Sequence, residues 1–558
     1  MARVLATLIL APVAALALWL ALSAQRPRAE LVVAVDQIRT IDPHRVSWSD
    51  EIRIAQALFE GLTRLDARQD APQPAVAARW ERSDDGLRYR FELRPEARWS
   101  TGEPVIAEDF RRSWLRALDP DTESQYAALL FVIDGAQRYY ESRLNDDDHD
   151  DATPESVGVA EAGDSALEVR LRAPCAYFLE LTAFPTLAPV HRSVWAAARG
   201  AAPSWNRADE IIGNGPLTLA SWQFKNHLWL ERNGHYRERN VGPLSLEFLI
   251  SSSPAASLIS YETGRIDVLT DLEPETVAAL RRARRCDLHV GDRFATFFFR
   301  VNCRRPPLDD PRVRQALSLA IERELLCEHV TALGETPAYT FVPTTALDAL
   351  TQPRADGGAA RYRPPPGLMH RASTSERVSR ARELLAASDY AALPRALEIA
   401  FAPEPVQQRR IAEAIQAMWE RNLGIPVQLR VTERHFLSTR IRELDYDVAR
   451  SDWYGDYLDP STFLDLFHVS SAQNRTGWSN AEYDRLIAAA AHEPDGQRRY
   501  DLLSQAERIL CEQELPILPL YHKRGTFLIR DDVQGLGDNL RGALPVHRAR
   551  RSGGAKSP

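Results

Sequence analysis

The stretch from Ile411 to Val431 combines a helical pattern, a stop signal and a strand-like run, and it restricts the fold class more than any other segment. Apolar residues recur at three- and four-residue steps from Ile411 to Trp419, as on the buried face of a helix. An Asn-Leu-Gly stop follows at 422–424, and the strand-like run occupies 427–431. The stretch therefore predicts a helix-to-strand unit whose helix covers a sheet.

Strand-like runs alternate with helical stretches elsewhere, so we expect a mixed α/β fold. A second helical pattern covers 313–321, and the strand-like runs are 31–35, 89–93, 167–171, 217–219 and 295–301. A chain of 558 residues with 44% apolar content exceeds what one core usually needs, which predicts two or three lobes.

The net charge of -8 and the pI near 6.0 argue against a nucleic-acid partner, because proteins that bind nucleic acids normally carry a basic face.

The N-terminus predicts export. Arg3 precedes an apolar run over residues 4–24, and the chain turns polar at 25–28. The length of this run favours an uncleaved membrane anchor, whereas the small residues around Ala21 and Ser23 and the arginines that follow favour a cleaved signal peptide. Either reading of residues 1–28 places the rest of the chain in the periplasm.

The segment 445–460 (DYDVARSDWYGDYLDP) places an arginine, aromatic residues and carboxylates between a strand-like run and a proline. Arg450, Trp453 and Asp456 would then be presented from a strand end. A cation and an anion that flank exposed main chain suit a peptide, whose termini pair with them while its amides extend the strand edge. The alternative is an ordinary strand and polar turn, with Trp453 in a core and Arg450 paired with Asp447.

Several motifs occur in order along nearly the whole chain. They are IDPH at 41–44, ALFEGL at 57–62, FELRPEARWSTGEPV at 91–105 with EDF at 108–110, NGPLTL at 214–219, LERN at 230–233, FFRVN at 298–302 and PLDDPRVRQAL at 307–317. In these motifs the chain resembles the periplasmic oligopeptide-binding protein family, the family 5 extracellular solute-binding proteins of peptide ABC importers.

The resemblance implies a three-lobed periplasmic-binding-protein (Venus-flytrap) fold with mixed sheets and the ligand enclosed between lobes I and III. We place lobe I at 29–66, 191–286 and 529–558, the last with a basic tail, lobe II at 67–190 and lobe III at 287–528. The implied function is capture of short peptides by hinge closure and delivery to the permease subunits of an inner-membrane ABC importer. We expect a monomer with no cofactor.

The resemblance also implies a set of site residues. Asp456 matches the family aspartate that receives the peptide's α-ammonium, and Arg450 matches an arginine that receives its carboxyl terminus. Gln408, with Arg409 beside it, replaces a histidine that serves another peptide length. The stretches whose main chain pairs with the peptide match Asp452, Trp453 and Tyr454 in lobe III and Ser47, Trp48 and Ser49 in lobe I.

Other functions remain open at this stage. A periplasmic hydrolase could use Asp456 and Asp459 as acid and base, although no nucleophile elbow, zinc helix, Walker A loop or dinucleotide turn occurs. The same fold could bind a specialised ligand such as a nickel complex, haem or a sugar, or act as a tethered sensor without a permease.

The five cysteines are scattered, with no CxxC pair, so we expect no metal site. Cys286 and Cys303 begin and end two strand-like stretches, 286–290 and 295–303. In an oxidising compartment they could be bridged, and the alternative is two free buried thiols.

Overall fold

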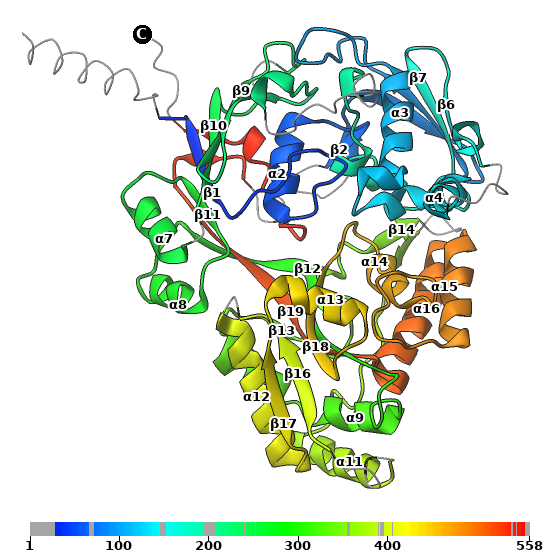
Figure 1. Cartoon of the computed structure of the whole chain (residues 1–558), viewed down its shortest axis with the longest axis vertical. Helices are drawn as coiled ribbons and strands as arrows, with labels where there is room; N and C mark the ends of the chain where they lie inside the picture. Colours follow the sequence, from blue (N-terminus) through cyan, green and yellow to red (C-terminus); the bar gives the residue numbers. More distant parts are fainter. Residues whose placement is uncertain are drawn as a thin grey trace, which may run out of the picture.

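The computed structural model describes residues 28–65, 72–145, 152–194, 207–238, 241–251, 253–353, 358–388, 390, 395–403, 406–536, 539–542 and 544–552. The fold is mixed α/β, as predicted, with one large mixed sheet and a smaller antiparallel sheet (Figure 1). Nearly all of the predicted signal peptide or anchor, residues 1–27, lies outside the described residues. Within the described ranges no helix has the length and apolar character needed to cross a membrane.

The large sheet has eleven strands in the order β17-β16-β18-β12-β19-β11-β1-β10-β9-β8, with β13 paired to β19. Their bounds are β1 Leu31–Val35, β8 Leu217–Gln223, β9 His227–Arg232, β10 Ser245–Ile250, β11 Val268–Thr270, β12 Leu288–Val301, β13 Thr336–Pro337, β16 Leu397–Phe401, β17 Val427–Val431, β18 Val448–Tyr454 and β19 Ile517–Ile529. Parallel pairs join β1 to β10 and β11, and β16 to β17 and β18.

The clusters of buried residues divide the described chain into three lobes. Lobe I is the β11-β1-β10-β9-β8 part of the sheet with α2 (Ser49–Leu58), α7 (Pro254–Glu262) and α8 (Pro274–Arg282). Lobe II is the sheet of β4 (Ala77–Arg82), β5 (Arg88–Leu93), β7 (Ala166–Arg170) and β6 (Val159–Glu161), with α3 (Ala107–Ala117), η2 (Ala127–Val132), α4 (Ala136–Asn145) and α5 (Phe178–Leu181). Lobe III is the β17-β16-β18 part with α9 (Pro311–Leu319), α11 (Thr374–Ala386), α12 (Val406–Leu423), α13 (Arg434–Arg442), α14 (Ser461–Leu464), α15 (Ala481–His492) and α16 (Gly496–Arg508).

Shorter elements complete the chain. They are β2 (Thr63–Leu65) with β3 (Pro72–Pro74), β14 (Thr351–Pro353) with β15 (Ala359–Arg361), β20 (Val533–Gln534) with β21 (Arg550–Arg551), α10 (Arg323–Leu325), and several single turns of helix.

Two long antiparallel strands, β12 and β19, connect lobes I and III (Figure 1). Their register shifts between Asp292 and Thr296, so β12 carries extra residues there and bulges. Gly291 pairs with Gly525 beside this bulge. A Cβ on Gly525 would lie 2.2 Å from Nε of Arg293, so only glycine leaves room for that buried guanidinium. The connection between the lobes is therefore continuous sheet with a local irregularity.

The predicted helix-to-strand unit is present in lobe III. The helix is α12, and it ends before Gly424, whose φ is +69° and whose N–H donates to Glu420 O at 3.0 Å. Glycine is favoured at this left-handed position because it has no Cβ. The strand β17 follows α12 in the chain and pairs in parallel with β16, which precedes α12. The three elements therefore form a βαβ unit.

The possible bridge between Cys286 and Cys303 is not formed, and all five cysteines are free. The two cysteines flank the 14-residue strand β12, which at about 3.3 Å per residue separates them by on the order of 45 Å. A disulfide requires Cα atoms within about 7 Å. The alternative of two free thiols is confirmed, but their expected burial is wrong: Cys286 is exposed beside Asp531, and Cys303 is only partly buried.

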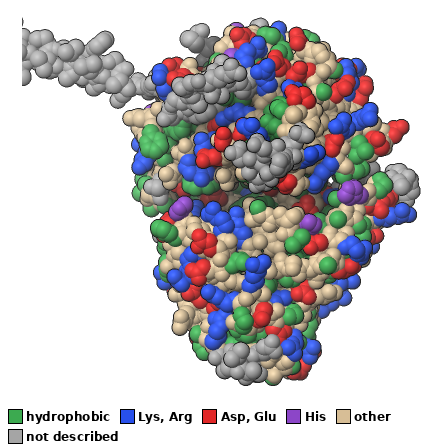
Figure 2. Space-filling view, turned by 45° about the vertical axis from the view of Figure 1, so that its right-hand side comes forward, with side chains coloured by type: hydrophobic (Ala, Val, Ile, Leu, Met, Phe, Trp, Pro, Cys, Tyr) green, Lys and Arg blue, Asp and Glu red, His purple; other side chains and the backbone are tan. Residues whose placement is uncertain are grey.

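The surface carries interspersed charges. Figure 2 shows arginine, aspartate and glutamate side chains mixed over one face, with no basic patch there. That distribution agrees with the net charge of -8.

Candidate ligand-binding site

The strand β18 leaves part of its main chain unpaired. It pairs with β12 along its whole length, from Val448 opposite Val301 to Tyr454 opposite Ala295. On its other side it pairs with β16 only at Val448 and Ala449. Within the described part of the chain, the main chain from Arg450 to Tyr454 therefore has no strand partner on that side. Such an edge is a template for an added strand.

A charged cluster lies at the start of this edge. Asp452 pairs with Arg450 at 3.1 Å and with Lys523 of β19 at 2.7 Å, and each side chain is only about a fifth to a quarter exposed. Burial alone would raise the pKa of Asp452, but the two cations hold it well below its usual range. The Lys523 ammonium also lies 4.4 Å from the centroid of the Tyr454 ring. The cluster of two cations and one anion carries a net positive charge.

Arg450 therefore pairs with Asp452, and the alternative partner considered from the sequence, Asp447, is engaged elsewhere. Asp447 accepts hydrogen bonds from Arg395 at 2.6 and 3.0 Å and from Arg305 at 3.2 Å. The Nε atom of Arg450 is buried and has no hydrogen-bond partner among the described residues. One donor of this guanidinium is thus left for a further group.

Asp456 lies just beyond the other end of the edge. Its N–H donates to Thr462 Oγ1 at 3.0 Å, and its carbonyl accepts from Arg541 at 3.0 Å. Its carboxylate has no hydrogen bond or ion pair with any residue that the structure describes. Burial raises the pKa of Asp456 to about 7, and Arg541 opposes the rise. An ionised carboxylate in this position is destabilised until a cation reaches it.

Asp456 lines a cavity of about 230 Å³ between lobes II and III. Lobe III contributes Trp453, whose buried Nε1 has no hydrogen-bond partner in the part of the chain that the structure describes. The other lining residues are Gln125, Tyr126, Ala128, Leu129, Phe131, Val132, Arg172, Tyr177 and Leu181 from lobe II, and Tyr457, Thr462, Asp465, Leu466, Ser471 and Gln473 from lobe III. The sequence patterns predicted none of the lobe II residues that line this cavity.

The same loop holds the lobes together. Tyr457 stacks on Tyr177 of lobe II with ring centroids 3.7 Å apart and planes at 6°. The N–H of Leu458 donates to Glu180 at 2.9 Å, and Arg541 from the C-terminal stretch pairs with the same carboxylate. Residues distant in sequence thus meet beside Asp456, and lobes II and III are in contact there, as in a closed form.

Ser47, Trp48 and Ser49 lie at the start of α2 in lobe I, and none of them lines the Asp456 cavity. The buried Glu51 carboxylate accepts the N–H groups of Ser47 at 3.1 Å and Trp48 at 3.3 Å, and Arg39 lies over the Trp48 ring at 3.7 Å. Two main-chain donors expected to face a ligand are therefore used inside the lobe.

Gln408 and Arg409 lie on α12, which covers β16 and β17. Gln408 is buried, and no described residue forms a hydrogen bond with its Oε1. Arg409 is half exposed and 4.0 Å from Glu413. The structure does not bring either residue to the Asp456 cavity.

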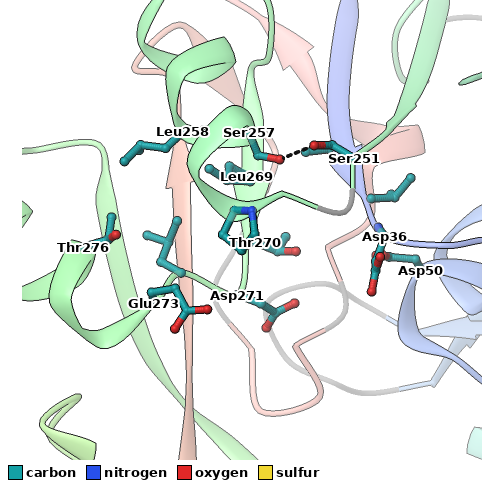
Figure 3. A pocket seen from close by; sticks show the side chains of 14 residues that line it. Asp36, Asp50, Ser251, Ser257, Leu258, Leu269, Thr270, Asp271, Glu273 and Thr276 are labelled. Carbon is teal, nitrogen blue, oxygen red and sulfur yellow. Dashed lines mark hydrogen bonds between the residues drawn. The ribbon is translucent and has the colours of Figure 1, made fainter. Parts of the chain in front are cut away.

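A second cavity, of about 220 Å³, lies in lobe I where the parallel strands β1, β10 and β11 end (Figure 3). Asp36 and Asp50 line one side, and Asp271 and Glu273 line the other. The carboxyl ends of parallel strands are a common location for ligands. Glu275, just beyond the cavity, pairs with Arg410 of α12, so this edge of lobe I faces lobe III.

Sequence reasoning missed Lys523, Arg541, Thr462 and Asp465. Lys523 could have been singled out because it is one of three lysines in the chain. Its partner, Asp452, is 71 residues away, so no local pattern indicated that the two form a pair. Arg541 is 85 residues from the carbonyl it contacts. Across the described residues, no cluster of three or more metal-ligating side chains occurs.

An open strand edge with charged groups near both of its ends is typical of a protein that binds an extended ligand. Comparison with known proteins supports that class. The family "Bacterial extracellular solute-binding proteins, family 5 Middle" matches residues 71–475. The chain belongs to this family, the solute-binding proteins of peptide importers, which are binding proteins and not enzymes.

Named relatives cover most of the chain. The oligopeptide-binding protein OppA of Bacillus subtilis is 30% identical over 489 residues, 87% of this chain and 85% of the relative. The periplasmic oligopeptide-binding protein OppA of Escherichia coli is 30% identical, with coverage of 89% and 88%. The E. coli protein YgiS, named as a probable deoxycholate-binding periplasmic protein, is 32% identical, with coverage of 89% and 88%.

The fold matches solved structures of the family, which confirms the three-lobed prediction. The murein tripeptide binding protein MppA of E. coli superposes with a TM-score of 0.80 at 29% identity, covering 94% of this chain and 99% of the other. An unliganded open form of MppA gives a TM-score of 0.71. The lower score against the open form agrees with the closed arrangement described above.

Proposed function

We propose that this protein captures short peptides in the periplasm and delivers them to an ABC importer. The observation that carries the proposal is the free edge of β18, which has a net positive cluster at one end and an unpaired carboxylate at the other. A peptide has the complementary pattern, with a carboxylate and an ammonium at opposite ends of an amide chain. The peptide-binding names of several relatives support the same reading.

The proposed peptide runs antiparallel to β18, with its ammonium on Asp456 and its carboxylate near Arg450 and Lys523. Residues 450–454 offer an edge of about 16 Å at about 3.3 Å per residue. That length suits a peptide of about three to five residues. Main-chain pairing is indifferent to side chains, so the edge itself favours capture of many sequences.

Closure of the lobes is the proposed delivery step. The peptide joins lobe III at β18 to the lobe II wall of the Asp456 cavity, so it binds the closed form better than an open one. The closed monomer then docks on the permease. A periplasmic location, with residues 4–24 as a cleaved signal or an inner-membrane tether, completes the proposal.

A specialised ligand without an ammonium is less compatible with the site. A bile acid such as the one in the name of YgiS carries a carboxylate, which would leave Asp456 unpaired or face it with a like charge. The geometry therefore favours peptides over such ligands.

Calorimetry with matched ligands tests the proposal. We expect Ala-Ala-Ala to bind and N-acetyl-Ala-Ala-Ala to bind at least tenfold more weakly, because acetylation removes the cation. Native mass spectrometry of the exported protein should also detect a spread of co-purified short peptides. Equal affinity for the free and acetylated peptides, or a single non-peptide mass, would contradict the function.

A further inference from the structure

The C-terminal segment 539–542 contacts the loop 455–460 that carries Asp456, here called the Asp456 loop. Arg541 donates to the carbonyl of Asp456 at 3.0 Å, and its side chain is only 10% exposed. The same guanidinium pairs with Glu180 of α5 in lobe II, whose side chain is 15% exposed. Arg541 therefore links the C-terminal segment to both lobe II and lobe III, beside the proposed ammonium site.

Glu180 holds the Asp456 loop at a second main-chain position. Its Oε2 atom accepts the N–H of Leu458 at 2.9 Å and also accepts from the Arg541 guanidinium. One ion pair thus binds the carbonyl of Asp456 and the N–H of Leu458, two residues further along the loop. Hydrogen bonds to charged groups are stronger than those between neutral groups, so a largely buried pair of this kind restrains the loop.

The segment that carries Arg541 is attached to the strand that connects the lobes. The N–H of Phe294 in β12 donates to the carbonyl of Leu540 at 2.7 Å. The carbonyl of Phe294 accepts the N–H of Gly455, the residue before Asp456, at 2.8 Å. The bulged part of β12 therefore holds the Arg541 segment and the Asp456 loop side by side.

The charge of Arg541 also acts on Asp456. Burial raises the pKa of Asp456 to about 7, and Arg541 opposes that rise. Glu180 is paired with Arg541 and so limits the positive charge that reaches Asp456. The other titratable or charged side chains that line the cavity are Tyr126, Arg172, Tyr177, Tyr457 and Asp465. Removing Arg541 or Glu180 should therefore change the proton affinity of Asp456 in opposite directions.

We propose that Arg541 is a positioning residue for recognition of the peptide's ammonium: together with Glu180 it fixes the Asp456 loop and sets the charge balance at Asp456. The inference rests on the peptide-binding function proposed above. Arg541 does not line the cavity, so it acts through Asp456 and not by touching the ligand. Because Glu180 comes from lobe II and the loop from lobe III, the arrangement is complete only when these lobes meet, and closure completes the ammonium site.

Calorimetry on the full-length exported protein tests this role, with Ala-Ala-Ala and N-acetyl-Ala-Ala-Ala as ligands at pH 6 and pH 8. Arg541→Gln should bind Ala-Ala-Ala about tenfold more weakly at pH 8 and by a larger factor at pH 6, because Asp456 without the nearby cation keeps its proton to a higher pH. Glu180→Gln should also weaken binding, but by a smaller factor at pH 6 than at pH 8, because the unopposed Arg541 charge favours the ionised carboxylate.

Three controls separate positioning from general damage to the fold. Arg541→Lys keeps the charge, so its loss of affinity should be the same at both pH values and smaller than that of Arg541→Gln. Affinity for N-acetyl-Ala-Ala-Ala should change less than about threefold in every variant, because this ligand has no ammonium to pair with Asp456. Arg440→Gln removes an arginine of similar exposure, 12%, that pairs with Glu398 and Asp445, and should change neither affinity.

The outcomes separate the inference from the function on which it rests. If Arg541→Gln and Glu180→Gln weaken both peptides by the same factor at each pH, the positioning role is refuted while peptide capture stands. If the unaltered protein binds neither peptide, both are refuted. Glu180→Gln decides the matter where Arg541→Gln does not fold, because a loss that is larger at pH 6 than at pH 8 would overturn the inference.

Discussion

Replacing Asp456 by asparagine should change stability and binding in opposite directions. The folded pKa of about 7 lies above the ordinary value of 3.8, so the folded chain keeps a proton that the unfolded chain has released. The stability that this group contributes is fully present below pH 4 and is lost as the pH rises through 7. An asparagine side chain cannot ionise, so the unliganded variant avoids that loss, but it also cannot pair with a peptide ammonium.

The magnitudes follow from the same shift. Each pKa unit is worth about 1.4 kcal/mol, which gives an upper bound of about 4 kcal/mol above pH 7, and partial exposure of the residue lowers this to about 2 kcal/mol. For a chain of this length that is about 2 °C in Tm, from an unfolding entropy of about 2 cal/mol/K per residue. Loss of the charge pair with the ligand should cost about 3 kcal/mol, or roughly a hundredfold in Kd.

Thermal unfolding of the unliganded protein at pH 5 and pH 8, with titration by Ala-Ala-Ala at pH 8, measures both effects. We expect the variant to gain Tm over the unaltered protein at pH 8 by more than at pH 5, and to lose affinity at pH 8. Asp348→Asn removes an exposed carboxylate and should change neither. A variant that loses Tm at both pH values, or that binds the peptide normally, would refute the assignment of Asp456.

Two further substitutions test the scaffold. Gly525→Ala places a Cβ 2.2 Å from Arg293 in the strands that connect the lobes, so we expect a loss of about 2 kcal/mol in urea unfolding, whereas Gly234→Ala, with open space around its Cβ, should be nearly neutral. Arg499→Met strands a fully buried carboxylate and should cost about 3–5 kcal/mol, while Arg485→Met, from an exposed pair, should cost less than about 1 kcal/mol. Similar losses of stability for the two arginine variants would show that burial does not explain the contribution of the Arg499–Asp459 pair.

Local patterns predicted the elements that are self-contained. The strand 31–35 agrees with β1, and the helical pattern and Asn/Gly stop after Ile411 agree with α12 and its end at Gly424. These elements depend on periodicity and on one backbone conformation that glycine adopts readily, so a few adjacent residues determine them. A ligand-binding strand edge at 450–456 could likewise be proposed from the residues of that segment alone. Its strand propensity and its charges both come from adjacent residues.

What local patterns could not predict depends on long-range pairing. The sequence showed two strand-like stretches, 286–290 and 295–303, where the structure has one strand, because the bulge near Asp292 interrupts the alternation without ending the ladder. The partners of Asp452 and Asp456 come from β19 and the C-terminal stretch.

In the proposed mechanism, the position of the Asp456 loop links binding of the peptide to closure of the lobes. Asp456 lines the cavity, its carbonyl accepts from Arg541, and the next residues contact lobe II through Tyr457 and Leu458. In the proposed mechanism, closing the lobes would remove water from an ionised Asp456, and this would oppose closure when the cavity lacks a cation. A bound ammonium reverses that penalty, so the ligand shifts the population toward the closed form by the difference in its affinity for the two forms. If Asp456 binds the ligand's ammonium as proposed, its charge also sets the free energy of closing, so a neutral residue at position 456 should leave the empty protein more closed than the unaltered chain above pH 7.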